Sequence, residues 1–479
     1  MTVNRIARWL VLGLAAGAAW IGLSAPAQAI PVFARQTGHN CQACHISYPE
    51  LTAYGREFKL NGYTFGEAQT LPLAAAIMGE YDTLSNGKDA TTGNATCTGS
   101  GGAGNPGNCS HAELVQYSIF YGGRISDNFG MFGQMSGNQF PISNTGTFSP
   151  TADNTEFRYV HRVLSADSLE PEAVFGLNMN NNPTMQDVWN AVPAWRFPWF
   201  PYLPAGYGAL AAPYIDGNGG HNKVGIGVYA WVHKTWYAEL NLYHSATGPL
   251  SFMNWGSGNT EQAMGDQPSD VLKGENPYYR LAYSKDWGYN SMEVGIFGIN
   301  AKSYYCNPAG GGAAPCTTDP TAYNKYNDIA IDAQYQYNRN EPWVISADGS
   351  FIHERNDLSA QFNATGGANL AQAQHTVNEL QLKATAYYYR MYGLTVGYSS
   401  LWGTTDPLQY ASGSGGSATG DPRSSWWTFE LNYLPLQDLR FSLLFQAFTK
   451  INGGAGNFDG VGNNASGQNR VTGAIWWVW

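Results

Sequence analysis

The chain has 479 residues, of which 13% are charged and 14% aromatic, and it contains 57 glycines. The charged share is about half that of an ordinary soluble protein, yet a mean hydropathy of −0.30 is too polar for a bundle of transmembrane helices. Few charges, many aromatic residues and a polar average together indicate an outer-membrane β-barrel, whose strands are apolar on the lipid side only. The net charge of −10 argues against nucleic acid as a partner and favours cations.

Residues 1–29 are predicted to be a secretory signal peptide. Arg5 and Arg8 precede the apolar run WLVLGLAAGAAWIGL, and the small-residue cleavage site AQA ends at Ala29. An uncleaved membrane anchor is the alternative, but the apolar run is short for a transmembrane helix. We therefore expect an exported protein, in a compartment where thiols oxidise and c-type haem is attached.

A haem-attachment motif follows the signal peptide. Cys41-Gln-Ala-Cys44-His45 is a C-x-x-C-H sequence, in which the two cysteines would form thioether bonds to the porphyrin and His45 would be the proximal iron ligand. The alternative is a redox-active or disulfide-bonded cysteine pair followed by a chance histidine. The sequence has no second C-x-x-C-H, so one covalently attached haem c is expected.

Alternation of apolar and polar residues with a period of two runs through the chain after residue 70. In WYAELNLYH, residues 236–244, the residues Trp, Ala, Leu and Leu alternate with Tyr, Glu, Asn and Tyr. The pattern recurs in NDIAIDAQYQYN, NELQLKATAYY and SWWTFELNYL. A soluble sandwich would also alternate, but here the apolar face often ends in aromatic residues, as in the interfacial girdle of a membrane barrel.

About 16 strands are predicted from this alternation. They span residues 73–84, 112–126, 128–138, 156–165, 172–180, 223–233, 235–246, 277–285, 288–300, 327–338, 341–353, 375–390, 391–402, 424–434, 437–450 and 470–479. Short links alternate with long links rich in Gly, Asn and Ser, and the last strand ends on Trp479. Short periplasmic turns, long outside loops and a terminal aromatic are typical of porins, so the expected fold class is all-β, an outer-membrane barrel of about 16 antiparallel strands.

The haem segment is too small to enclose its cofactor alone. Residues 30–70 number about 40, near the limit below which a small domain needs outside support. A barrel of the predicted size encloses an aqueous lumen, and the chain enters it from the periplasmic side. We therefore expect a monohaem c-type cytochrome plug (30–70), at the periplasmic mouth or inside the barrel, followed by a porin-like barrel (71–479).

Met78 is a candidate for the distal haem ligand. It lies on the first predicted strand, on the same face as Glu80 and Asp82, and is expected to point into the lumen. A Met/His pair would raise the haem potential, which suits acceptance of electrons from a weak reductant. The alternatives are that Met78 merely packs against the plug, or that a lumenal histidine, a plug backbone group or an open site takes its place.

The other four cysteines lie in two predicted outside loops. Cys97 and Cys109 flank one Gly-rich stretch, and Cys306 and Cys316 flank another. Because disulfides persist outside the cell, we expect one disulfide in each loop. A metal site at Cys109 and His111 is the alternative.

The segment of residues 180–214 links the fifth and sixth predicted strands and is rich in Pro and Trp. A stiff, apolar loop of this kind does not suit water. We expect it to fold into the lumen as a constriction or lid near the haem; an external loop packed against its neighbours is the alternative.

Residues 31–65, PVFARQTGHNCQACHISYPELTAYGREFKLNGYTF, resemble the N-terminal module of the outer-membrane fused cytochrome–porins. Besides the haem motif, the similar stretches are Phe33 to Gly38, Pro49 to Thr52, Gly55-Arg56 and Phe58 to Tyr63. Over the barrel the resemblance is one of pattern. The best-known members of that family oxidise extracellular Fe(II), so the resemblance implies a plugged barrel and an electron donor of this kind.

The expected function is electron transfer across the outer membrane. Extracellular Fe(II), or another small reductant, would give electrons to the single haem, and a periplasmic c-type cytochrome or similar acceptor would collect them. Because the apolar belt of such a barrel is about 25 Å tall, either the reductant enters the lumen or further redox centres dock from outside. A small soluble cation suits the first route better than a mineral surface does. Acidic residues predicted to face the lumen and attract a cation are Glu80, Asp82, Glu239, Asp332, Asp348, Glu379 and Glu430. The alternatives are a solute porin with a redox-sensitive haem plug, a conduit for another donor, and a haem-based sensor with an open sixth position.

Overall fold

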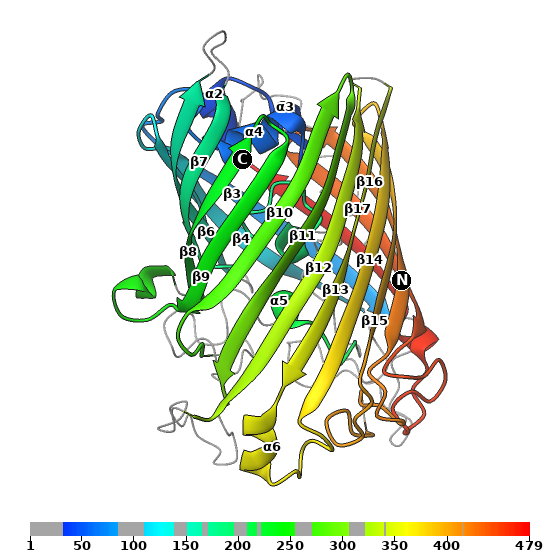
Figure 1. The fold of residues 1–479 in the computed structure, drawn as a ribbon. Coiled ribbons are helices and arrows are strands. Elements are labelled where there is room, and N and C mark those ends of the chain that lie inside the picture. Colours follow the sequence, from blue (N-terminus) through cyan, green and yellow to red (C-terminus); the bar gives the residue numbers. More distant parts are fainter. Residues whose placement is uncertain are drawn as a thin grey trace, which may run out of the picture.

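The structure, a computed structural model, describes residues 32–84, 110–137, 151–164, 171–195, 208–217, 222–253, 271–305, 321–339, 342–413 and 415–479. In these residues the wall is one closed antiparallel barrel, in which each strand pairs with its neighbours in the sequence and the last strand pairs with the first (Figure 1). The strands are β3 (Leu73–Leu84), β4 (Ser110–Arg124), β5 (Phe129–Gly137), β6 (Thr151–Leu164), β7 (Pro171–Asn180), β8 (Lys223–Val232), β9 (Trp236–Ser245), β10 (Asn276–Trp287), β11 (Asn290–Tyr304), β12 (Tyr323–Asn338), β13 (Trp343–Asp357), β14 (Gln374–Tyr388), β15 (Tyr392–Gly403), β16 (Ser424–Leu436), β17 (Leu439–Lys450) and β18 (Arg470–Val478). The predicted barrel is confirmed, and each predicted strand has its counterpart.

The two faces of the wall differ as the alternation predicts. On β9, Trp236 and Leu240 are 59% and 49% exposed, whereas Tyr237 and Asn241 are 2% and 0% exposed. The outward side chains are apolar on the other strands too, so a continuous apolar surface surrounds a polar interior. No helix in the described part of the chain is long and apolar enough to cross a membrane. A closed barrel with an apolar outer face places the protein in the outer membrane.

The two ends of the barrel are unlike. At one end the links are short turns, such as residues 233–235 between β8 and β9 and residues 389–391 between β14 and β15. The other end carries the long links, which include α6 (Ser359–Thr365) and η3 (Ala465–Gln468). Since short turns face the periplasm in such barrels, the end with short turns is the periplasmic mouth.

The plug occupies the periplasmic mouth, where Figure 1 shows its helices beside the short turns. It consists of α2 (Val32–Thr37), α3 (Cys41–Cys44), β1 (His45–Ser47), β2 (Glu50–Leu51) and α4 (Ala53–Leu60). The small antiparallel pair of β1 and β2 was not predicted, because strands this short show no periodicity.

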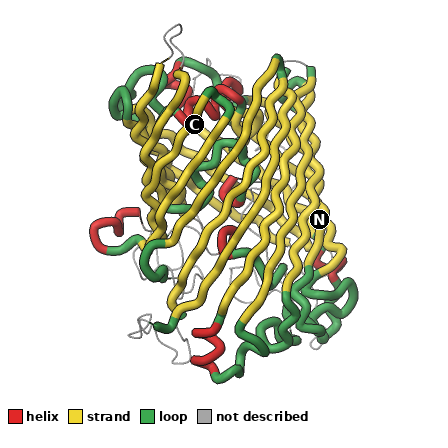
Figure 2. Tube along the Cα trace, viewed as in Figure 1, coloured by secondary structure: helices red, strands yellow, loops and turns green. Residues whose placement is uncertain are grey.

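Helix is confined to the plug, the lumen and the links. Figure 2 shows the wall as strand throughout, with short helical turns inside it and at its ends. The turns outside the plug are η1 (Pro193–Trp195), α5 (Tyr214–Gly217), η2 (Gly248–Met253), α6 and η3. The protein is therefore a strand barrel with a helical insert.

We expect unboiled protein to migrate differently from boiled protein in denaturing electrophoresis, because a closed barrel keeps its hydrogen-bonded ring in detergent until it is heated. Circular dichroism of the unboiled sample should be dominated by β-structure. Equal migration of the two samples together with a helical spectrum would contradict the fold.

Candidate haem-binding site

The attachment motif forms a single turn of helix at the periplasmic mouth. Asn40 caps α3, since its side-chain oxygen accepts a hydrogen bond from a backbone N–H inside the motif at 3.1 Å. The turn presents Cys41 and Cys44, and His45 begins β1 directly after it. Helix α4 packs so closely that a Cβ at Gly55 would lie 2.2 Å from Cys44 O, which is why glycine stands there.

All three motif residues line one pocket. Counting its open mouth, the pocket holds about 1220 Å³ of space between atoms. Three regions of the chain build its wall. Among its lining residues are Val32, Phe33, Tyr48, Phe58, Lys59 and Tyr63 of the plug, Ala74, Phe120, Phe132, Gln134, Trp476 and Val478 of the barrel, and Asp187, Asn190 and Trp195 of the segment that follows β7.

The three motif residues fit a c-type haem. Cys41 and Cys44 are not joined in a disulfide, so both thiols are available for thioether bonds. Burial lowers the pKa of His45 to about 4, which keeps its imidazole neutral at pH 7, the form that binds a metal. His45 Nδ1 is buried and has no hydrogen-bond partner among the described residues. Burial also raises the pKa of Cys44 to about 12, so this thiol stays protonated until it reacts.

Met78 faces the lumen as predicted and is 3% exposed. It packs in a cluster with Trp476 and Val478, two residues that line the pocket, but Met78 itself is not among the lining residues. Tyr48 joins the same cluster from the plug, and its ring centroid lies 4.8 Å from that of His45. Met78 therefore lies close to the pocket, and its role as distal ligand stays a prediction.

Two substitutions at Met78 separate ligation from packing. Met78→Ala should shift the reduction potential in either case, because it opens a gap behind Trp476 and changes the burial of the cofactor. Met78→Leu keeps the side-chain volume and removes only the sulfur. Absorption spectra of the oxidised and reduced protein decide the question: a wild-type spectrum in Met78→Leu would remove Met78 as a ligand.

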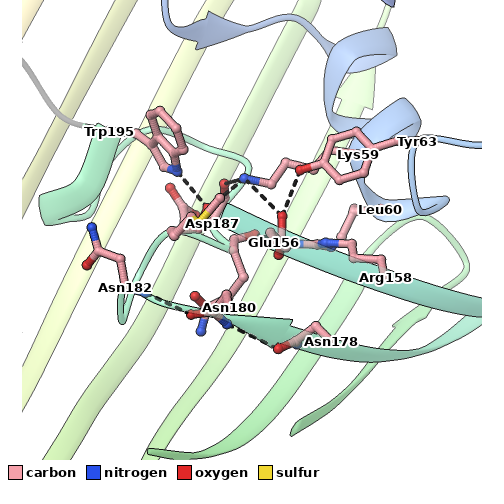
Figure 3. Close-up of polar contacts among 12 residues, drawn as sticks. Lys59, Leu60, Tyr63, Glu156, Arg158, Asn178, Asn180, Asn182, Asp187 and Trp195 are labelled. Carbon is pink, nitrogen blue, oxygen red and sulfur yellow. Dashed lines mark hydrogen bonds and ion pairs between the residues drawn. The ribbon is translucent and has the colours of Figure 1, made fainter. Parts of the chain in front are cut away.

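Lys59 connects the pocket to the interior of the barrel (Figure 3). Its Nζ donates to the backbone oxygens of Met185 at 2.6 Å and Asp187 at 3.1 Å, and lies 3.8 Å from Glu156 Oε2. Glu156 also accepts a hydrogen bond from Tyr63 Oη at 2.7 Å. Burial lowers the pKa of Lys59 to about 8, although Glu156 opposes this shift. One plug lysine thus joins the pocket, the wall and the lumenal segment.

Arg56 anchors the opposite side of α4 to the wall. Its guanidinium donates to Gln336 Oε1 at 2.7 Å, to Asp286 Oδ1 at 3.2 Å and to Ser291 Oγ. The side chain is buried, and its wall partners belong to three adjacent strands, β10, β11 and β12. Arg56 therefore fixes both the depth and the rotation of α4 in the mouth.

Further polar contacts hold the plug around the rest of the ring. They are Arg124 N to Gln36 Oε1 at 2.9 Å, Arg162 Nε to Asn61 Oδ1 at 2.8 Å, Lys234 Nζ to Glu57 Oε1 at 2.9 Å, Lys383 Nζ to Glu50 Oε2 at 3.8 Å, and Arg440 to Tyr48 O at 2.9 Å. The wall residues come from β4, β6, β14, β17 and the turn after β8. Because contacts lie on all sides of the mouth, no single one of them acts as a hinge.

We expect Arg56→Gln to weaken docking of the plug by about 2–4 kcal/mol, because the buried partners of the guanidinium lose their charge-assisted hydrogen bonds. Hydrogen exchange of the α3 and α4 amides should quicken accordingly, while the barrel keeps its shift on unboiled gels. The control is Arg339→Gln, which removes an exposed guanidinium from the periplasmic turn after β12. Equal exchange in both variants would contradict the anchoring role.

The described parts of the segment after β7 lie inside the lumen, as predicted. Asp187 is 3.3 Å from Arg280 of β10, and Asn190 Oδ1 accepts a hydrogen bond from Leu51 N of the plug at 2.9 Å. Farther along, the backbone N–H groups of Tyr214 and Ile215 donate to carboxylates of β13 and β12 at 2.6 and 2.8 Å. Residues 181–195 and 208–217 therefore fill part of the interior, and residues 181–195 contact the plug directly.

The predicted acidic lumen residues all point inward, and three of them pair with buried basic residues. All seven are at most 9% exposed. Asp332 pairs with Arg280 at 2.7 Å, and Asp348 pairs with Lys383 at 2.8 Å. Glu430 pairs with Arg440 at 2.6 Å. Two of the basic residues are shared: Arg280 also lies 3.3 Å from Asp187 and 3.0 Å from Glu293, and Lys383 lies 3.8 Å from Glu50. Attraction of a cation by these carboxylates therefore stays a prediction.

Other predicted features lie outside the described residues. These are the signal peptide and the four loop cysteines Cys97, Cys109, Cys306 and Cys316. Within the described ranges, no group of three or more His, Cys, Asp or Glu side chains is placed to hold a metal ion. A haem would bring its own porphyrin nitrogens and would need only His45 and a distal group from the chain.

Comparison with known proteins concerns the barrel alone. No family model matches the sequence, and no curated protein matches it. Among solved structures, the chain is similar to OmpF of Salmonella typhi in complex with daunomycin, at a TM-score of 0.47 and 10% identity, covering 85% of this chain and 97% of that chain. It is also similar to the outer membrane channel DcaP of Acinetobacter baumannii, at a TM-score of 0.43 and 11% identity over 85% and 96% of the two chains. A third similar structure is an anion-selective porin from Comamonas acidovorans, at a TM-score of 0.43 and 12% identity, covering 85% of this chain and 98% of that chain. At such identities the likeness concerns the fold and not the activity.

Proposed function

We propose that this outer-membrane barrel is an electron-transfer protein that carries one covalently attached haem c in the plug pocket. The observation that carries the proposal is the placement of Cys41, Cys44 and His45 together at one apolar pocket, with the imidazole buried and neutral. These residue types in this order are the attachment site of c-type haem. Both thiols are free and partly buried, so a disulfide does not account for the cysteine pair.

The chain's own residues would hold and shield the cofactor. Cys41 and Cys44 would bind the porphyrin through thioether bonds, and His45 would ligate the iron. Phe58 and Trp476 would exclude water from opposite sides, one from the plug and one from the wall. Bound there, the haem would supply a one-electron carrier at the periplasmic mouth.

The electron donor we propose is extracellular Fe(II), with other small reductants as the wider class. Each Fe²⁺ would give one electron and leave as Fe³⁺, and a periplasmic c-type cytochrome or similar acceptor would take the electron at the mouth. The choice of iron rests on the resemblance of residues 31–65 to the cytochrome–porins.

A second candidate is a solute channel whose haem plug responds to redox state. The porin-like architecture favours it, since a barrel of this size is wide enough for a solute path. The arrangement inside the barrel opposes free passage: the plug is anchored around the mouth, and residues 181–195 lie in the lumen.

We expect haem to remain on the wild-type polypeptide in denaturing electrophoresis and dissolved Fe(II) to reduce it, while iron in a complex too bulky for the lumen reacts far more slowly. His45→Ala should abolish the reaction and leave barrel assembly intact. His39→Ala is the matched control, because His39 also lines the pocket but is exposed at its rim.

Three results separate the candidates. Loss of haem from the denatured wild-type chain would contradict the cytochrome. Haem that dithionite reduces and Fe(II) does not would contradict iron as donor and leave another reductant. Large single-channel conductance in a planar bilayer that changes with haem redox state would favour the solute channel.

A further inference from the structure

A groove crosses the outer face of the barrel near its periplasmic end. Counting its open side, it holds about 710 Å³. Its lining belongs to β8, β9, β10 and β11, and includes Ala230, Val232, Trp236, Ala238, Leu281 and Tyr283. Every one of these side chains is apolar or aromatic, so the groove suits a hydrocarbon.

Two small residues create the hollow. Ala230 of β8 and Ala238 of β9 lie directly opposite each other in the strand register. On either side, the same face carries large side chains: Val228 and Leu240 are 52% and 49% exposed, and Trp236 is 59% exposed. The outer face therefore has a furrow between these large side chains.

A lone positive charge lies on the same face beyond the groove. Lys285 follows Tyr283 by two residues along β10, which places it about 7 Å nearer the periplasmic turn. Its side chain is exposed and makes no ion pair with the residues that the structure describes. The neighbouring charges have partners: Lys234 pairs with Glu57 of the plug at 2.9 Å, Asp286 pairs with Arg56 of the plug at 3.2 Å, and His233 lies 3.9 Å from Glu172 of β7.

Aromatic residues mark the depth of this site in the membrane. The rings of Trp236 and Tyr283 meet edge to face at 5.0 Å, and Trp287 is 41% exposed beside Lys285 on the same strand. Such aromatics lie at the boundary between acyl chains and headgroups. The groove is thus at acyl-chain depth and Lys285 at headgroup depth.

We propose that this groove and Lys285 form a binding site for an anionic phospholipid of the periplasmic leaflet. The acyl chain lies in the furrow over Ala230 and Ala238, and the phosphate pairs with Lys285. The occupant follows from the surroundings, because the face is in the bilayer, the furrow is apolar and the unpaired charge is positive where phosphates lie.

The test is native mass spectrometry of the delipidated full-length protein, titrated with phosphatidylglycerol and, separately, with uncharged diacylglycerol. The wild type should retain one phosphatidylglycerol at low concentration. Ala238→Leu fills the furrow and should weaken binding of both lipids about tenfold. Lys285→Gln should weaken phosphatidylglycerol about fivefold and leave diacylglycerol unchanged, because it removes one surface charge only.

Two control variants should bind lipid as the wild type does. Ala384→Leu makes the same change on the outer face of β14, away from the groove, and Lys325→Gln removes an exposed lysine from the opposite end of β12. Unboiled gels confirm that every variant is folded. Equal lipid binding in all variants would overturn the proposal. So would a wild-type dimer that Ala238→Leu dissociates, since the groove would then bind a second copy of this chain.

Discussion

Closure of the barrel is the constraint on which the rest of the structure depends. In a lipid environment a strand edge cannot be left without hydrogen-bond partners, and pairing of β18 with β3 removes the last free edge. The same closure creates an enclosed interior. That interior supplies the burial that a plug of about 40 residues lacks, so the membrane fold and the cofactor pocket depend on each other.

The interior holds the plug mainly through charge. Arg56, Lys59 and Glu50 of the plug contact polar residues of the wall. In the other direction, Lys234 and Arg440 of the wall contact the plug. Buried charges are costly unless they are paired. A shift of the plug would separate these charges from their partners, so few other positions of the plug are favourable. The plug therefore takes one position, which brings Phe132 and Trp476 of the wall against the attachment motif.

The geometry bears on function through what fills the lumen. A solute channel needs a continuous path, whereas here residues 181–195 lie across the interior and Asn190 contacts the plug at 2.9 Å. An electron carrier needs only that a donor and an acceptor reach its cofactor. Asp332, Asp348 and Glu430 each pair with a basic residue of the wall, so part of the acidic composition takes part in ion pairs inside the barrel.

The sequence alone determined the wall and predicted a haem-attachment motif. Inward and outward residues of a strand alternate with a period of two, so local pattern sufficed to predict β3 to β18 within a few residues, and Cys41, Cys44 and His45 are neighbours in the chain. Only the tertiary structure decided what surrounds that motif. Lys59 and Glu156, or Leu51 and Asn190, are far apart in sequence and meet because the barrel closes around the plug. Alternation predicted that Asp332 faces inward, but its partner Arg280 lies two strands away, and the register of β10, β11 and β12, which alternation does not give, brings the two together.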